Sequence, residues 1–232
     1  MQKFLTIIPA RKGSKRIKEK NIKLLNGKPL IYYTITAALK SKAGKYPVIV
    51  STDSRKIAKQ SEEFGAKVPF FRSAELATDH ASSVGLVLEC LDYYKKRGEE
   101  FEIIIMLQPT SPLRTAQDIN EAIKKFNDKK FDALVSVAGV SEHPELMYRV
   151  KGEVLESINS EKCYCFKRSQ EMSKLYRING AIYIIKASEF INTKSFIIDR
   201  TGYYEMPFER SIDIDEPADF RLAEFFLKEK HK

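Results

Sequence analysis

Residues 3–16 read KFLTIIPARKGSKR, and this stretch decides the class of fold. Its first half is a short run of apolar and β-branched residues, which predicts a buried strand that stops at Pro9. A basic loop follows directly, and Pro29 suits the first turn of a helix over residues 29–41. A buried strand, a polar loop and a helix in this order predict the first βα unit of an α/β protein.

The same alternation continues along the chain. Further strands are predicted at residues 48–50, 67–71, 103–107, 133–137 and 181–185, and further helices at 54–64, 81–97, 116–127 and 217–229. Either Asp53 or Ser54 is expected to cap the helix at 54–64. This order predicts a three-layer, Rossmann-like α/β fold with a mostly parallel sheet and helices on both faces. Ligands of such sheets bind beyond the carboxyl ends of the strands, where the loops 10–28, 51–54 and 108–114 begin.

The alternation stops near residue 140. Residues 141–176 are polar and contain no clear core helix. We therefore predict a core made of residues 1–140 and 177–232, interrupted by an excursion over residues 141–176. An excursion of this kind is expected either to cover the active site or to pair with a second subunit.

The net charge is concentrated in one segment. The chain has 40 Lys and Arg against 31 Asp and Glu, which gives +9. Residues 1–28 hold nine of the basic residues and one acidic residue, so they carry +8 and the other 204 residues carry +1. This distribution indicates one anion-binding site rather than the extended basic surface of a nucleic-acid-binding protein. No aromatic residue lies between Phe4 and Tyr32, which argues against stacking on bases.

Segment lengths and cysteine spacing exclude other classes of protein. The apolar run over residues 4–10 is too short for a signal sequence or a bilayer span, and no later stretch reaches about 18 apolar residues. Cys90, Cys163 and Cys165 form no CxxC pair, so neither a disulfide framework nor a thiolate zinc site is indicated. We expect a protein of the reducing cytoplasm that has no membrane partner.

The loop over residues 10–16 is suited to hold a polyphosphate. Gly13 and Ser14 allow the backbone to turn its N–H groups toward a ligand, while the Arg and Lys residues around them add positive charge. The loop lacks the GxxxxGK[ST] pattern, and no GxGxxG follows a predicted strand. The alternative is a solvated basic surface, which is what runs of charge usually are.

Asp213 and Asp215 are candidate metal ligands. In extended geometry the two carboxylates project from one face of the chain, about 6–7 Å apart. Mg²⁺ usually takes one or two carboxylates and completes its shell with water and substrate phosphate. The alternative is that these acids form a strand edge or cap the helix that begins near Pro217.

Together these segments resemble the CMP-sialic acid synthetase family, the cytidylyltransferases that activate nonulosonic acids. The resemblance spans nearly the whole chain in six blocks that occur in the family's order. They are residues 7–16 (IIPARKGSKR) with Lys20 and Asn21, 50–53 (VSTD), 71–72 (FR) with 75–83 (ELATDHASS), 107–114 (LQPTSPLR), 177–183 (RINGAIY) and 211–215 (SIDID).

The resemblance implies a nucleotidyltransferase that moves CMP from CTP to the anomeric hydroxyl of a 2-keto sugar acid. Pyrophosphate is released, and Mg²⁺ is required. Within this family the excursion is a dimerisation arm, so a homodimer is expected. Such a transfer needs alignment and charge neutralisation more than covalent help, which agrees with the lack of a visible catalytic triad.

The family's site residues are transferred position by position. Arg11 and Lys20 would face the triphosphate and, with Asp213 and Asp215, form the predicted catalytic set. The predicted nucleotide contacts are Ala10, Arg11, Ser14, Lys20, Asn21, Arg72 and Ser83; the sugar-acid contacts are Gln108, Arg177, Asn179 and Tyr183; the metal ligands are Asp213 and Asp215.

The chain also departs from the family pattern. Lys12-Gly13 stands where relatives often have Gly-Gly or Gln-Asn, and Ser169 follows Lys167-Arg168 where many relatives have a pair of arginines. The 108–114 loop favours a sialic or legionaminic acid over pseudaminic acid or KDO as substrate. A regulatory nucleotide sensor without turnover is the remaining alternative, although such a sensor would not need Asp213 and Asp215.

Overall fold

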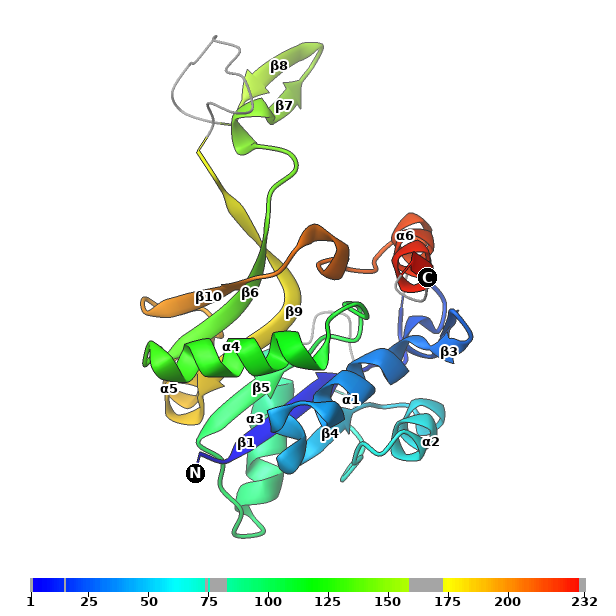
Figure 1. Ribbon diagram of the computed structural model, residues 1–232, viewed down its shortest axis with the longest axis vertical. Coiled ribbons are helices and arrows are strands. Elements are labelled where there is room, and N and C mark those ends of the chain that lie inside the picture. Colours follow the sequence, from blue (N-terminus) through cyan, green and yellow to red (C-terminus); the bar gives the residue numbers. More distant parts are fainter. Residues whose placement is uncertain (1, 15, 74, 76–82, 159–172, 230–232) are drawn as a thin grey trace.

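A six-stranded sheet forms the centre of the computed structural model, which describes residues 2–14, 16–73, 75, 83–158 and 173–229 (Figure 1). Its strands are β1 (Phe4–Pro9), β4 (Val48–Ser51), β5 (Ile103–Met106), β6 (Ala133–Gly139), β9 (Tyr176–Lys186) and β10 (Thr201–Glu205), in the order β10-β6-β9-β5-β1-β4. The pairs β1/β4, β1/β5 and β6/β10 are parallel, whereas β9 runs antiparallel to β5 and β6. The predicted mostly parallel sheet is therefore confirmed.

Successive side chains of β1 enter different hydrophobic clusters, as the two-residue period of a strand requires. Ile8 packs on the face covered by α1 (Leu30–Lys40), α2 (Arg55–Glu63) and α4 (Ala116–Asp128). Leu5 and Ile7 pack on the opposite face, against α3 (Ser83–Lys95) and α5 (Ala187–Thr193). Helices on both faces confirm the three-layer prediction. None of the described helices is both long and apolar enough to cross a membrane.

A third hydrophobic cluster lies beyond the sheet and joins segments distant in sequence. The helix α6 (Pro217–Glu229) contributes Phe220 and Ala223, and the basic loop contributes Ile17. Ile212 and Ile214, which flank Asp213, belong to the same cluster. Burial of these isoleucines therefore draws the acidic segment toward the basic loop, a placement driven by the hydrophobic effect.

The structure differs from the sequence prediction in several local features. The predicted strand over residues 67–71 is wrong: Lys67 and Phe71 form two isolated bridges, with Pro69 between them unable to donate a backbone hydrogen bond. Ser54, rather than Asp53, caps α2 by accepting the Ile57 N–H at 3.4 Å. α1 begins at Leu30, one residue after Pro29, whereas α6 begins at Pro217 as predicted. β9 begins five residues before the predicted strand.

The described part of the excursion contains a β-hairpin that stands apart from the main sheet. Its strands, β7 (Tyr148–Lys151) and β8 (Val154–Ser157), pair only with each other among the described strands, and Figure 1 shows the hairpin projecting from the far end of β6 and β9. Several of its apolar side chains are largely exposed, among them Val150, Val154 and Leu155. Cys163, Cys165 and the 167–169 segment lie outside the described residues.

Candidate active site

A cleft of about 480 Å³ opens beyond the carboxyl ends of β1 and β5. Parallel strands end at the same edge of a sheet, so their loops converge there. The lining is mixed, with apolar residues from the strand ends and charged residues from the loops. It comprises Pro9, Arg11, Gly13, Ser14, Arg16, Ile17, Lys20, Asn21, Arg72, Ser83, Leu86, Gln108, Pro109, Thr110 and Asp215.

Backbone and side-chain hydrogen bonds hold the basic loop over the cleft. The Ala10 N–H donates to the Ser51 carbonyl at 2.9 Å, and the Lys12 N–H donates to Asp53 Oδ1 at 2.6 Å. Asn21 Nδ2 donates to the Arg11 carbonyl at 3.0 Å from the far side of the loop. The predicted 51–54 loop therefore supports the cleft from behind instead of lining it.

Arg72 brings a buried cation to the wall of the cleft. Its Nη2 donates to the Ser51 carbonyl at 2.6 Å and its Nε to Ser51 Oγ at 3.1 Å. Burial lowers the pKa of the Arg72 guanidinium and the charge of Arg11 lowers it slightly, whereas Asp53, Cys90 and Glu89 act in the opposite direction. Arg72 and Arg11 therefore offer positive charge to an anion in the cleft, and the nearby acids offset part of that charge.

Lys20 connects the basic loop to the acidic segment. Its Nζ donates to the Ile214 carbonyl at 2.7 Å and to Asp215 Oδ1 at 3.0 Å, across more than 190 residues of sequence. The Lys20 side chain is only 15% exposed, whereas that of Asp215 is 54% exposed. Arg16 approaches the other Asp215 oxygen at 3.5 Å. The Asp215 carboxylate thus lies at the mouth of the cleft between two cations.

Asp213 has a different environment from Asp215. Burial raises the pKa of the Asp213 carboxyl and the charge of Asp215 raises it further, while a hydrogen bond from Thr110 and the charges of Lys20 and Arg177 act in the opposite direction. Its Oδ1 is buried and has no hydrogen-bond partner within the described part of the chain. A buried carboxylate oxygen without a donor calls for an explanation, and an absent cation is one.

The acidic pair does not supply the observed cap at the start of α6. The carboxylate that accepts the backbone N–H groups of Asp215 and Glu216 there is that of Asp219, at 3.0 and 2.7 Å. The segment before α6 is not a strand of the described sheets either. Both structural alternatives for Asp213 and Asp215 therefore lose their support.

Comparison with known proteins identifies the family. A cytidylyltransferase family model matches residues 5–228. The chain belongs to the cytidylyltransferase family. It is 37% identical to CMP-N,N'-diacetyllegionaminic acid synthase of Legionella pneumophila over 97% of both chains. It is also 37% identical to N-acylneuraminate cytidylyltransferase of Streptococcus agalactiae, covering 94% of this chain and 52% of that relative. The resemblance to CMP-sialic acid synthetases is thereby confirmed.

One further relative and one solved structure extend the comparison. Pseudaminic acid cytidylyltransferase of Campylobacter jejuni is 31% identical over 99% of this chain and 98% of its own length. Among solved structures, a CMP:2-keto-3-deoxy-manno-octonic acid synthetase complexed with CTP matches with a TM-score of 0.71 at 19% identity, covering 98% of this chain and 99% of that one. At that identity the structural match supports the nucleotidyltransferase fold alone.

The predicted nucleotide contacts of this cytidylyltransferase come together in space. Arg11, Ser14, Lys20, Asn21, Arg72 and Ser83 all line the cleft. Ala10 is fully buried and does not line the cleft, and its N–H donates to the Ser51 carbonyl. Lys15 lies outside the described residues. The individual roles of these residues stay predictions.

The predicted sugar-acid contacts are divided between the cleft and the protein interior. Gln108 lines the cleft, and the exposed Arg177 acts electrostatically on Asp213. The Asn179 amide is buried and bonds Ser136 Oγ at 2.6 Å and Ser211 Oγ at 2.9 Å. Tyr183 packs against Phe196, and burial raises its pKa. The structure therefore places Asn179 in the interior and Tyr183 in a half-buried position, where the charge of Asp213 also raises the tyrosine pKa.

Sequence reasoning missed residues that act on the cleft from behind. Gly180 has a φ of +75°, and a Cβ there would lie 2.8 Å from Gln108 Oε1 and 3.8 Å from Asp213 Oδ2. The buried Arg114 donates to the Ala181 carbonyl at 2.7 Å and to the Gln108 carbonyl at 3.2 Å. Burial lowers the pKa of Arg114 to about 9, so its guanidinium stays charged at neutral pH. Both residues lie in segments that carry the family resemblance, 107–114 and 177–183, but neither was predicted as a site residue; a glycine beside Asn179 is typical of a close backbone approach.

Proposed function

We propose that this enzyme transfers CMP from CTP to the anomeric hydroxyl of a nonulosonic acid of the sialic or legionaminic type. The observation that supports this proposal most directly is the contact of Lys20 with Asp215, which joins the basic loop to the acidic segment at one cleft; Asp215 lines this cleft, and Asp213 lies two residues before it. The names of the relatives, which concern legionaminic, sialic and pseudaminic acids, support this class of substrate.

The residues of the cleft would act by alignment and charge neutralisation. In the transfer, the sugar hydroxyl loses its proton to water and its oxygen forms a bond to the α-phosphorus, while the bond to the pyrophosphate oxygen breaks and its electron pair leaves with pyrophosphate. Arg11, Lys20 and Arg72 would bind the triphosphate and stabilise the charge that develops on the leaving group. Gln108 and Arg177 would orient the sugar acid, whose carboxylate requires a cationic partner.

The acidic pair fits a divalent cation, for which we propose Mg²⁺. Asp213 and Asp215 would hold it. Asp213 offers a buried oxygen that accepts no hydrogen bond from the described residues, and Asp215 offers an exposed carboxylate. No group of three or more His, Cys, Asp or Glu gathers as a metal site in the described part of the chain. Water and substrate phosphate would complete the shell, as is usual for Mg²⁺. When bound, the ion would neutralise phosphate charge and orient the reacting oxygens.

Pyrophosphate release from CTP tests the function directly. The assay uses sialic, legionaminic and pseudaminic acids and KDO in turn, with and without Mg²⁺. We expect the highest kcat/KM with a sialic or legionaminic acid, and turnover only when Mg²⁺ is present. Binding of CTP without turnover on any sugar acid would instead indicate a nucleotide sensor. A higher kcat/KM with pseudaminic acid or KDO would confirm cytidylyl transfer but contradict the proposed sialic or legionaminic substrate.

Asp213→Asn separates a metal ligand from a structural acid. We expect a loss of at least about 100-fold in kcat with little change in Tm, since the amide keeps the shape but binds a cation poorly. Asp132→Asn is the matched control, because the Asp132 carboxylate accepts from Lys186 Nζ at 2.6 Å and does not line the cleft. Loss of this partly exposed ion pair should lower stability by less than about 1 kcal/mol and leave kcat nearly unchanged. Equal kcat losses in both variants would contradict the assignment.

We also propose that the excursion forms a homodimer and that the enzyme works in the cytoplasm. The exposed apolar residues Val150, Val154 and Leu155 of the hairpin would be covered by a second subunit. Solution scattering should give twice the mass of one chain. A Val154→Lys variant should shift the mass toward one chain. A monomeric mass for the fully active wild-type protein would remove the dimer proposal.

A further inference from the structure

We propose that Asp118 and Arg210 are positioning residues whose ion pair holds the segment bearing Asp213 and Asp215 against the 108–114 loop. The inference rests on the proposed function and deepens it. Neither residue lines the cleft. Arg210 precedes Asp213 by three residues and Asp215 by five, whereas Asp118 lies 92 residues away in the first turn of α4.

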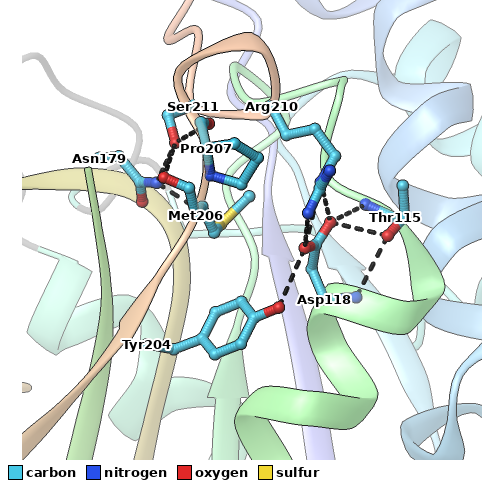
Figure 2. A network of polar contacts seen from close by, with 8 residues as sticks. All are labelled: Thr115, Asp118, Asn179, Tyr204, Met206, Pro207, Arg210 and Ser211. Atoms are coloured by element: carbon cyan, nitrogen blue, oxygen red, sulfur yellow. Dashed lines mark hydrogen bonds and ion pairs between the residues drawn. The ribbon is translucent and has the colours of Figure 1, made fainter. Parts of the chain in front are cut away.

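Asp118 accepts more hydrogen bonds than its helix needs. As part of a capping box it accepts from the Thr115 N–H at 2.9 Å and from Thr115 Oγ1 at 2.7 Å. It also accepts from Arg210 Nε and Nη2, both at 3.0 Å, and from the Tyr204 hydroxyl at 3.1 Å. Figure 2 shows the carboxylate enclosed between these three side chains. Five donors saturate the lone pairs of one carboxylate, so its position is strongly determined.

Within the ion pair, the Asp118 carboxylate is buried and the Arg210 guanidinium is partly exposed. The Asp118 side chain is 2% exposed and that of Arg210 is 33% exposed. A carboxylate in the interior needs a charged, hydrogen-bonded partner. The planar guanidinium supplies two parallel donors, which fix its orientation as well as its distance. Arg210 therefore cannot move away without leaving the buried Asp118 carboxylate without a charged partner.

Hydrogen bonds also hold the segment that leads from Arg210 to the cleft. Ser211 Oγ accepts from Asn179 Nδ2 at 2.9 Å and donates to the Pro207 carbonyl at 2.8 Å, as Figure 2 shows. The Ile214 N–H donates to the Thr110 carbonyl at 2.8 Å. Residues 211–215 form no helix or strand, so these contacts and the ion pair set where the two carboxylates lie.

Arg114 connects the region of this ion pair to Gln108, the predicted sugar-acid contact in the cleft. Arg114, four residues before Asp118, binds the carbonyls of Gln108 and Ala181. The residues from Arg114 to Asp118 thus contact both the 108–114 loop and, through Arg210, the acidic segment. A change in the Asp118–Arg210 pair should therefore alter the spacing of Asp213 and Asp215 from Gln108, while Arg11 and Arg72 keep their own anchors, at Asn21 and Ser51 respectively.

The test compares Arg210→Lys with Thr115→Ala. Arg210→Lys keeps the charge but loses the two-pronged contact, so the chain should still fold. Thr115→Ala removes the capping hydroxyl and leaves the ion pair in place. Each variant is saturated with CTP and titrated with Mg²⁺ while Tm is followed, a measurement that needs no turnover.

We expect Arg210→Lys to raise the Mg²⁺ midpoint and lower kcat, each about tenfold, with the KM for CTP unchanged. Thr115→Ala should lower Tm without moving the Mg²⁺ midpoint. An Arg210→Lys midpoint equal to that of the wild type, with only Tm lowered, would overturn the proposal and leave the pair as a structural contact. If the wild-type protein turns over no sugar acid, the proposed function fails, but the midpoints still decide whether the pair positions the carboxylates.

Discussion

Replacement of Gly180 by alanine probes the sugar side of the cleft. The residue has a φ of +75°, and its ideal Cβ would lie 2.8 Å from Gln108 Oε1. An L-residue in this conformation costs about 1–2 kcal/mol. For a chain of this length each kcal/mol lowers Tm by about 2–4 °C, so a loss of about 2–8 °C is expected. The methyl group must also displace the Gln108 amide, since that is the flexible end of the contact.

Gly98 offers a matched control. Its φ is +73°, and an added Cβ would meet nothing within 4 Å. Gly98→Ala should therefore share the conformational cost and lower Tm by a similar amount, without disturbing any cleft residue. A difference in activity between the two variants then reports the displacement of Gln108 alone.

Steady-state kinetics with CTP and the preferred sugar acid measures that difference. One lost hydrogen bond of about 0.5–1.5 kcal/mol corresponds to a rise of about two- to thirteenfold in KM for the sugar acid in Gly180→Ala. The KM for CTP should not change, because Arg11 and Arg72 are held by Asn21 and Ser51 and not by Gln108. If both alanine variants have the wild-type KM for the sugar acid, Gln108 does not contact that substrate and the reasoning is refuted.

Two further predictions concern buried titratable groups. Burial raises the pKa of the Cys90 thiol to about 12, so thiol reagents should label Cys90 in urea but not in the native protein; peptide mapping that finds rapid native labelling would contradict this. Burial acts to raise the pKa of Asp118, but hydrogen bonds from Arg210 and Thr115 together outweigh it and lower the pKa. The ionised form therefore stabilises the fold above about pH 4, and this stability is lost as the pH falls through the lowered pKa. The Tm deficit of Asp118→Asn should hence shrink between pH 7 and about pH 3, and a deficit constant over that range would refute this.

The strands and the basic loop could be predicted from the sequence because their signals are local. Apolar runs such as Ile103–Met106 indicate buried strands, and the loop after β1 combines glycine, serine and cations within a few residues. The antiparallel direction of β9 could not be predicted in this way. An apolar strand has the same composition in either direction, and the connection through the excursion decides how it enters the sheet.

The amino-acid sequence by itself determined the α/β class, the charged loop and the pairing of Asp213 with Asp215, since each depends on residues a few positions apart. Only the tertiary structure decided what surrounds those groups. The Lys20–Asp215 and Asp118–Arg210 contacts join residues 195 and 92 positions apart, and the burial of Asn179 places its amide in the interior. Such contacts leave no periodic trace in a single sequence, because desolvation and hydrogen-bond geometry arise only when distant segments pack together.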